Sequence, residues 1–277
     1  FNFKTKNTPP QCTELENFEE DLLNLVKTIK FKNTNSEFQK KLKTDVSKIK
    51  ANKNILVFAD KTSNIYELSP DQHEKLLLEN ITKTYKKAPE KLEHSINLEA
   101  KNIAKKINLE KRIETLAKSD AFITLKDHKD NFQNKLPCRL IVPSKSELGH
   151  VSKTYLDKII ITIRDKLKLN QWKNTTDPIT WFSKIKDKQK CTFIQLDIKE
   201  FYPSISKSIL EDTIKFAKKH TEISAEILRI IKHCRKSLLF FKNESWKKKD
   251  SHDCFDVTMG SFDGAEICEL VGLYILD

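Results

Sequence analysis

One carboxylate in this sequence is placed where it could take part in chemistry. Asp197 directly follows the apolar run at residues 193–196, and an aromatic residue, Tyr202, lies five positions further on. The run is short, and lysines precede it while Pro203 follows, so it predicts a buried strand. Because a lone carboxylate is costly to bury, an Asp at the end of a strand faces either solvent or a cation. Both interpretations stay open on the residue types alone.

Two basic residues lie upstream of Asp197 in a predicted hairpin. Residues 121–126 and 138–143 are apolar and are joined by a polar stretch at 127–136. Lys126 and Arg139 lie near the ends of these two strands. An Arg donates two parallel hydrogen bonds to a phosphate, and a Lys supplies a point charge. A basic residue in a hairpin is usually only a surface residue. A phosphate-binding role for Lys126 and Arg139 is therefore supported mainly by their distance upstream of Asp197.

Glycines are rare in this chain and they cluster. Three of the four glycines, Gly260, Gly264 and Gly272, lie within residues 257–273. Glycine marks backbone that turns with positive φ or that another group approaches closely. Asp263 is positioned to cap a helix that begins at Gly264. The alternative is an ordinary junction between a loop and a helix.

The remaining elements are mostly helices. Apolar spacing and capping residues predict helices at 13–29, 36–50, 70–86, 96–118, 151–169, 206–220 and 222–235, with a short one opening at Asp177. A second hairpin is predicted at 55–68, and a strand is predicted to begin at 238–241. The turn at residues 60–63, at the tip of the hairpin at 55–68, is predicted to be solvated and includes Asp60. We therefore expect an α+β protein.

Residues 196–206, LDIKEFYPSIS, resemble the first catalytic motif of reverse transcriptases. The resemblance implies that Asp197 and the backbone carbonyl of Ile198 hold two catalytic magnesium ions. It also implies that Tyr202 packs under the incoming sugar and excludes a ribose 2′-hydroxyl. Hard divalent ions with carboxylate ligands suit an in-line displacement at phosphorus.

The other two motifs resemble the same family and occur in the order expected for it. The hairpin at 121–143 resembles the fingers hairpin, which implies that Lys126 and Arg139 bind the incoming triphosphate. Met259, Gly260 and Ser261 resemble the loop that holds the template and the nascent base pair. Residues 262–265, FDGA, depart from the Ser-Pro sequence that is commoner in this family, so the way in which this segment contacts the template stays open.

The resemblance implies a reverse-transcriptase domain of a retroelement, with Penelope-like elements as the nearest comparison. Its fold would be the α+β fingers and palm of a right-hand polymerase at 121–277, preceded by a mostly helical region at 1–120. Its reaction would be RNA-templated addition of deoxynucleotides to a primer 3′-hydroxyl, with two Mg²⁺ ions. The partners would be an RNA template, a DNA or RNA primer and deoxynucleoside triphosphates.

One expected motif is missing. Reverse transcriptases carry two adjacent Asp residues after the glycine-loop helix, and this sequence contains no Asp-Asp pair. We therefore expect the palm to be incomplete at the C-terminus and the chain to be inactive alone. The alternative is a non-catalytic nucleic-acid-binding protein built on a truncated or decayed polymerase fold. A helical scaffold with no nucleic-acid role is a third and weaker possibility.

Composition is compatible with these functions. The 277 residues include 51 Lys plus Arg against 39 Asp plus Glu, a net charge of +12, which suits a polyanionic partner or reflects a lysine-rich proteome. The six cysteines form no CxxC pair, so we expect reduced thiols in an intracellular protein, in the nucleus or the cytoplasm. The longest apolar runs are too short to span a bilayer, so no membrane partner is expected.

Overall fold

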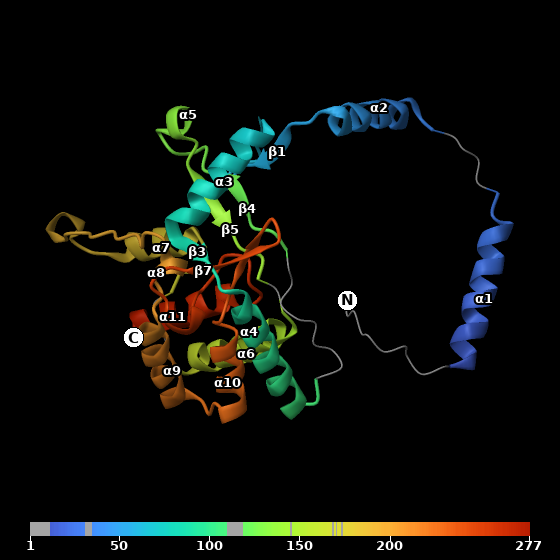
Figure 1. The fold of residues 1–277 in the computed structure, drawn as a ribbon. Helices are drawn as coiled ribbons and strands as arrows, with labels where there is room; N and C mark the ends of the chain where they lie inside the picture. Colours follow the sequence, from blue (N-terminus) through green and yellow to red (C-terminus); the bar gives the residue numbers. More distant parts are fainter. Residues whose placement is uncertain are drawn as a thin grey trace.

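The computed structural model shows a mostly helical α+β chain with small antiparallel sheets (Figure 1). It describes residues 12–30, 35–109, 119–144, 146–167, 169, 171–172 and 174–277. The α+β class expected from the sequence is confirmed. The last part of the helix expected at 96–118 lies outside the described residues.

Two amphipathic helices at the N-terminal end lie apart from the rest of the chain (Figure 1). They are α1 (Thr13–Thr28) and α2 (Glu37–Ala51), and neither buries a side chain. Ser36 and Gln39 form a capping box at the start of α2, which satisfies two backbone donors. Both helices were expected from their apolar spacing.

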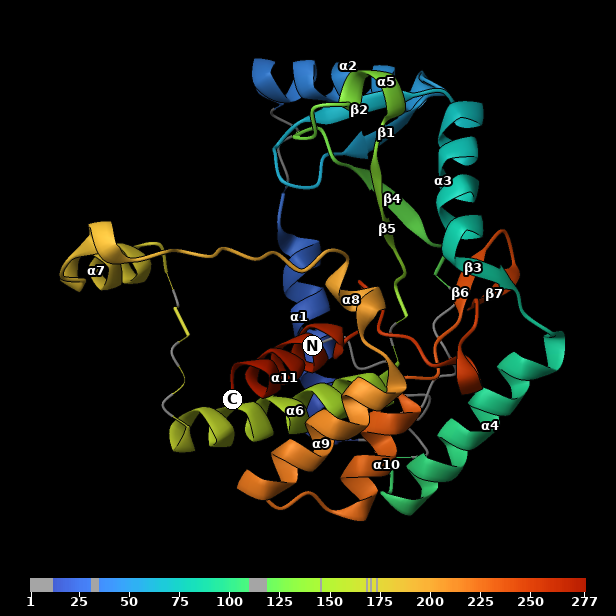
Figure 2. The ribbon, with the colours of Figure 1, turned by 90° about the vertical axis from the view of Figure 1, so that its left-hand side faces the viewer.

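Two hairpins stack to form the upper part of the body in Figure 2. Strands β1 (Ile55–Phe58) and β2 (Ile65–Leu68) pair antiparallel, as do β4 (Phe122–Leu125) and β5 (Cys138–Ile141). Both hairpins were expected. A parallel bridge between Ala59 and Leu125 joins them, and the short helix α5 (Phe132–Lys135) lies between β4 and β5 in the sequence.

Helix α3 (Pro70–Thr84) runs beside these hairpins (Figure 2). It starts as its sequence predicts, because Ser69 accepts a hydrogen bond from Gln72 and Pro70 occupies the first helical position. The core here combines side chains from both sides of residue 120, the expected boundary. Its members include Val57, Leu77, Ile81, Ile123, Leu125, Leu239 and Trp246.

The third sheet joins segments far apart in the sequence. Strand β7 (Glu244–Lys248) lies between β6 (Leu239–Phe241) and β3 (Tyr85–Lys87), antiparallel to both. The start of β6 was expected, but β3 and β7 were not. Both are short and lysine-rich, so only their distant pairing makes them strands.

The lower part of the body is a layer of helices (Figure 2). It contains α4 (Glu90–Lys106), α6 (Glu147–Lys166), α9 (Lys207–His220), α10 (Ala225–His233) and α11 (Gly264–Leu276). The core that α6, α9, α10 and α11 share includes Leu156, Ile163, Leu210, Ile214, Ala217, Ile267 and Leu270. Helix α4 packs on a separate cluster with Ile103, Leu148 and Ile230. No described helix combines the length and the apolar character needed to cross a bilayer.

An arm carrying α7 (Thr176–Lys184) projects from the body (Figure 2). After the short turn η1 (Lys188–Lys190), residues 191–198 form no strand, and Ile194 and Leu196 are 82% and 88% exposed. The expected buried strand before Asp197 is therefore wrong for this structure. No described strand pairs with the segment, so its backbone joins no sheet, and the side chains of Ile194 and Leu196 stay in solvent.

The arm has its own small aromatic cluster. The ring of Phe193 contacts those of Trp181 and Phe182 at centroid distances of 6.3 and 5.2 Å. Trp181 also contacts Trp172 at 5.4 Å. The chain then re-enters the body at α8 (Phe201–Ser204), which packs on the helical core.

Candidate nucleotide and nucleic-acid site

The glycine loop at residues 259–261 is fixed to the end of the hairpin that carries Arg139. The backbone N–H of Val142 donates to the carbonyl of Met259 at 2.8 Å. Gly260 has a φ of +114°, and a Cβ there would lie 2.7 Å from the carbonyl oxygen of Val142. Only glycine fits this conformation and this contact. Gly260 therefore shows both properties expected of the glycine cluster, a positive φ and the close approach of another backbone segment.

Tyr202 packs on the same loop. A Cβ added to Gly264 would lie 3.4 Å from Cε1 of Tyr202 and 2.6 Å from Oγ of Ser261. Ser261 Oγ donates to the carbonyl of Thr258 at 3.1 Å, which closes the loop ahead of α11. The aromatic residue of the first motif and the loop of the third motif are thus neighbours.

Arg139 lies on β5 two residues before Ile141, whose Cγ2 is 3.2 Å from the Cβ position of Gly260. Burial raises the pKa of the Tyr202 hydroxyl, Cys268 and Glu266 act in the same direction, and the positive charge of Arg139 opposes them. The phenol is therefore neutral at physiological pH. Burial also raises the pKa of the Cys268 thiol beside it to about 12, so this thiol is protonated.

The guanidinium of Arg139 is held by Asp60. Its Nη1 lies 2.7 Å from Oδ1 of Asp60, whose side chain is only 6% exposed, while that of Arg139 is 35% exposed. The turn is exposed at residues 61–63 as expected, but Asp60 is not solvated, because its side chain pairs with Arg139 of β5. A triphosphate on Arg139 would have to share or displace this carboxylate.

Lys126 lies on the same hairpin, directly after β4. Its backbone N–H donates to the carbonyl of Pro137 at 2.8 Å, and its side chain is half-buried. Burial raises the pKa of the Cys138 thiol to about 11, and the charge of Lys126 partly opposes this shift. The hairpin therefore carries Lys126 directly after β4 and Arg139 on the adjacent strand β5.

Asp127 ties the two hairpins together. Its Oδ2 accepts hydrogen bonds from Thr62 at 2.5 Å, Asn64 at 2.9 Å and Tyr66 at 3.1 Å. These bonds lower the pKa of the Asp127 carboxyl, with the Thr62 bond as the largest cause. The β1–β2 hairpin thereby supports the hairpin that carries the two basic residues.

Asp197 stands alone on the exposed segment between the arm and α8. Ile198 beside it is 52% exposed. No group of three or more His, Cys, Asp and Glu side chains placed to hold a metal occurs in the described part of the chain. Among the described residues, no such group accompanies Asp197.

A buried charge cluster behind the loop was missed from the sequence. Asp263 was expected to cap α11 with its side chain, but its carboxylate accepts from Ser152 at 2.6 Å and pairs with Arg235. Both partners in this ion pair are buried. Glu266, one turn further on, pairs with Lys153 of α6. The sequence signal was the presence of charged residues in or directly beside helices with apolar spacing.

Tyr202 of the first motif, strand β5 and the 259–261 loop thus meet at one place, while Asp197 lies on the exposed segment before α8. No protein-family model and no curated protein matches this chain. Its function must therefore be argued from the site.

Proposed function

We propose that this chain serves RNA-templated DNA synthesis as part of a longer retroelement protein, with the fingers and palm fold of a reverse transcriptase. The observation that carries the proposal is the meeting of three motifs that are distant in sequence. Tyr202, Arg139 on β5 and the 259–261 loop lie together, as a nucleotide site of this class requires. Catalysis of this kind depends mainly on positioning and charge neutralisation.

The geometry supports the following proposed roles. Tyr202 presents a neutral, half-buried ring against the loop, which suits packing under a deoxyribose. Met259, Gly260 and Ser261 form a rigid turn on which a template and a new base pair would rest. Lys126 and Arg139 would neutralise the triphosphate of the incoming nucleotide.

The magnesium ions belong to the complete enzyme in this proposal. Asp197 and the carbonyl of Ile198 are the ligands that the chain offers, and Mg²⁺ needs more than one protein ligand to be held. When bound, the pair of ions would stabilise the attacking and leaving oxygens. Further carboxylates are required beyond those near Asp197 in the described residues.

A second candidate function is nucleic-acid binding without catalysis. The exposed carboxylate of Asp197 favours it, because no group of metal-binding side chains lies among the described residues. In both cases the protein would be intracellular, in the nucleus or the cytoplasm. Its six cysteines are all free thiols.

Binding and synthesis are tested separately. Fluorescence anisotropy with a labelled RNA template annealed to a DNA primer should show binding that weakens steeply as salt rises, because phosphate contacts release counterions. Primer extension with Mg²⁺ is measured on the longer protein of this proposal, because the chain alone is expected to be inactive. It should require Asp197, so Asp197→Asn should abolish synthesis and retain binding. Binding with no extension under any condition supports the second candidate, and no binding at low salt contradicts both.

A further inference from the structure

The apolar faces of α1 and α2 are exposed. Neither helix buries a side chain, and both lie apart from the body of the chain (Figure 1). The two helices have 16 and 15 residues, and helices of this length are marginal in water unless an apolar face packs on a partner. Their formation therefore points to a surface that covers these faces.

The apolar residues of α1 have the spacing of a helix that packs on other helices. Leu15, Phe18, Leu22 and Leu25 follow one another at intervals of three and four residues, which is the spacing of a coiled-coil seam. Val26 directly follows Leu25 and is also exposed, so the apolar face is wider than that seam. A face of this width is typical of a bundle of more than two helices.

Helix α2 carries a similar face. Its apolar residues also follow one another at intervals of three or four residues, and they are Phe38, Leu42, Val46 and Ile49. All four are exposed. The two helices are nearly equal in length, so their faces can pack along their full extent.

The charges of the two helices are complementary. Helix α1 has five acidic residues and one basic residue, while α2 has five basic and two acidic residues. Glu14 and Asp21 each directly precede a leucine of the apolar face of α1, and Lys41 and Lys48 each directly precede an apolar residue of α2. Lys48 contacts Asp45 within α2 at 3.7 Å, but an exposed pair of this kind contributes little. Charges beside an apolar seam pair between helices and select the partner.

The acidic character of α1 does not suit two other classes of partner. An amphipathic helix that lies on an anionic membrane carries mainly Lys and Arg on its polar face. Nucleic-acid phosphates would likewise be repelled by α1. The partner that fits α1 is an apolar face with basic flanks, and α2 has this chemistry.

We propose that α1 and α2 form a self-association surface and that the partner is a second copy of this chain. The acidic α1 of one copy packs against the basic α2 of the other, and the reciprocal contact forms by two-fold symmetry. The resulting four helices cover the wide apolar faces, which a single pair of helices within one chain would leave partly exposed. This proposal does not depend on the proposed function.

Analytical ultracentrifugation of the full chain measures the association. Wild type should have the mass of two chains at micromolar concentrations. Leu22→Ala with Leu25→Ala keeps good helix formers but removes apolar contacts, so it should raise the dissociation constant at least about a hundredfold. The matched control is Leu56→Ala with Leu98→Ala, which alters exposed leucines of the body and should leave the dimer intact.

Charge reversal identifies the partner. One variant reverses α1 (Glu14→Lys with Asp21→Lys), and the other reverses α2 (Lys41→Glu with Lys48→Glu). Each alone places like charges beside the seam and should weaken association about tenfold at low salt. An equimolar mixture of the two variants should form a dimer again, because acidic flanks of each chain then meet basic flanks of the other. Mixing cannot restore a contact within one chain.

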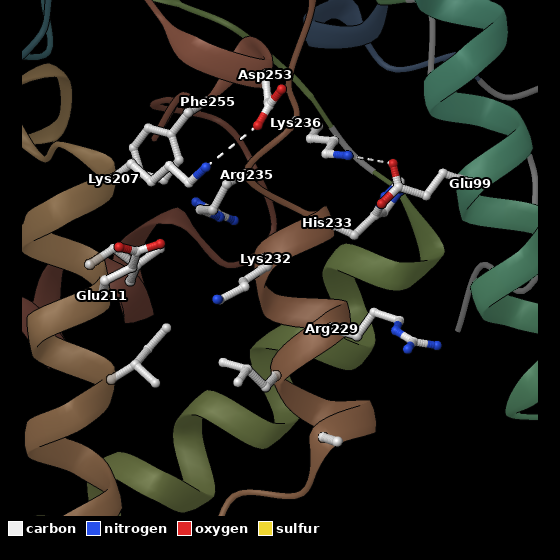
Figure 3. A pocket seen from close by; sticks show the side chains of 14 residues that line it. Glu99, Lys207, Glu211, Arg229, Lys232, His233, Arg235, Lys236, Asp253 and Phe255 are labelled. Atoms are coloured by element: carbon white, nitrogen blue, oxygen red, sulfur yellow. Dashed lines mark hydrogen bonds and ion pairs between the residues drawn. The ribbon is translucent and has the colours of Figure 1, made fainter.

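The matched control for charge reverses two exposed cations of the body, Arg229→Glu with Lys232→Glu. These residues lie on α10 beside a cavity of about 450 Å³ between α9 and α10 (Figure 3). The control should change association less than about twofold. A chain that is monomeric at every concentration, a dimer that the α1 and α2 variants leave intact, or a mixture that stays monomeric would overturn the proposal.

Discussion

Gly260 is the residue whose backbone decides the shape of the candidate site. With a φ of +114° and Val142 at its Cβ position, Gly260→Ala should destabilise the fold by about 1–3 kcal/mol. Urea denaturation measures this change.

Gly272 is the matched control for that substitution. It lies inside α11 with no atom within 4 Å of its Cβ position, so Gly272→Ala should stabilise by about 0.5–1 kcal/mol. Equal effects of the two substitutions would show that the tight loop is not held as described.

Asp263 is predicted to be among the most costly residues to remove. Asp263→Ala leaves the buried guanidinium of Arg235 without its counter-charge, which should cost about 3–5 kcal/mol. The double variant Arg235→Met with Asp263→Leu should recover most of this loss, because it removes both charges. Asp212→Ala, which breaks an exposed pair with Lys215, should cost less than about 0.5 kcal/mol in the same unfolding experiment.

His233 makes stability depend on pH. Burial lowers its pKa below the usual 6.5, while Glu99 opposes the shift and Lys236 acts with burial. As pH falls below 6.5, the unfolded chain takes up the proton first, so the stability present at pH 8 is lost as pH falls through the folded pKa.

The comparison of wild type with His233→Gln isolates this residue. The free energy of unfolding should fall more from pH 7.5 to pH 5.5 in wild type than in the variant. His73, whose pKa burial also lowers, is present in both proteins and cancels. Identical pH slopes would contradict the assignment.

At the scale of elements, the sequence correctly predicted the helix caps and hairpins that depend on interactions between residues close together in the chain. Ser69 and Ser206 cap α3 and α9 with the hydrogen bonds that their positions suggested. Both hairpins also formed where alternating apolar runs and polar turns indicated them. Each of these features is decided within a few residues.

Elements that depend on distant partners were not predictable in this way. Strand β3 exists because β7 pairs with it across more than half the chain. The apolar run at 191–196 has strand composition, but no described strand supplies the ladder that it needs. The composition of a segment gives it a preference for the strand conformation, but it forms a strand only where another strand is in place to pair with it.

Helices α1 and α2 should be separable from the body. Neither buries a side chain, so a chain that begins at residue 52 should unfold within about 0.5 kcal/mol of the full chain. Thermal and urea denaturation of the two chains measure the difference. A loss of several kcal/mol would show that these helices pack on the body in solution.

At the scale of the whole molecule, the candidate site was predicted in part. Sequence order placed Tyr202, Arg139 and residues 259–261 in one site, and the structure brings them together. The same reasoning did not find the Asp60 partner of Arg139 or the cluster around Asp263, because both depend on which buried charges meet in three dimensions. The cavity between α9 and α10 was missed for the same reason.

The central claim is that nucleic acid rests on the 259–261 loop beside Tyr202. Photocrosslinking tests it most directly, with an RNA template that carries 4-thiouridine opposite the primer terminus. Mass spectrometry of the digested complex should place the crosslinks at Met259 or its loop neighbours and at Tyr202. Crosslinks confined to other surfaces, with the template bound at low salt, would contradict the claim.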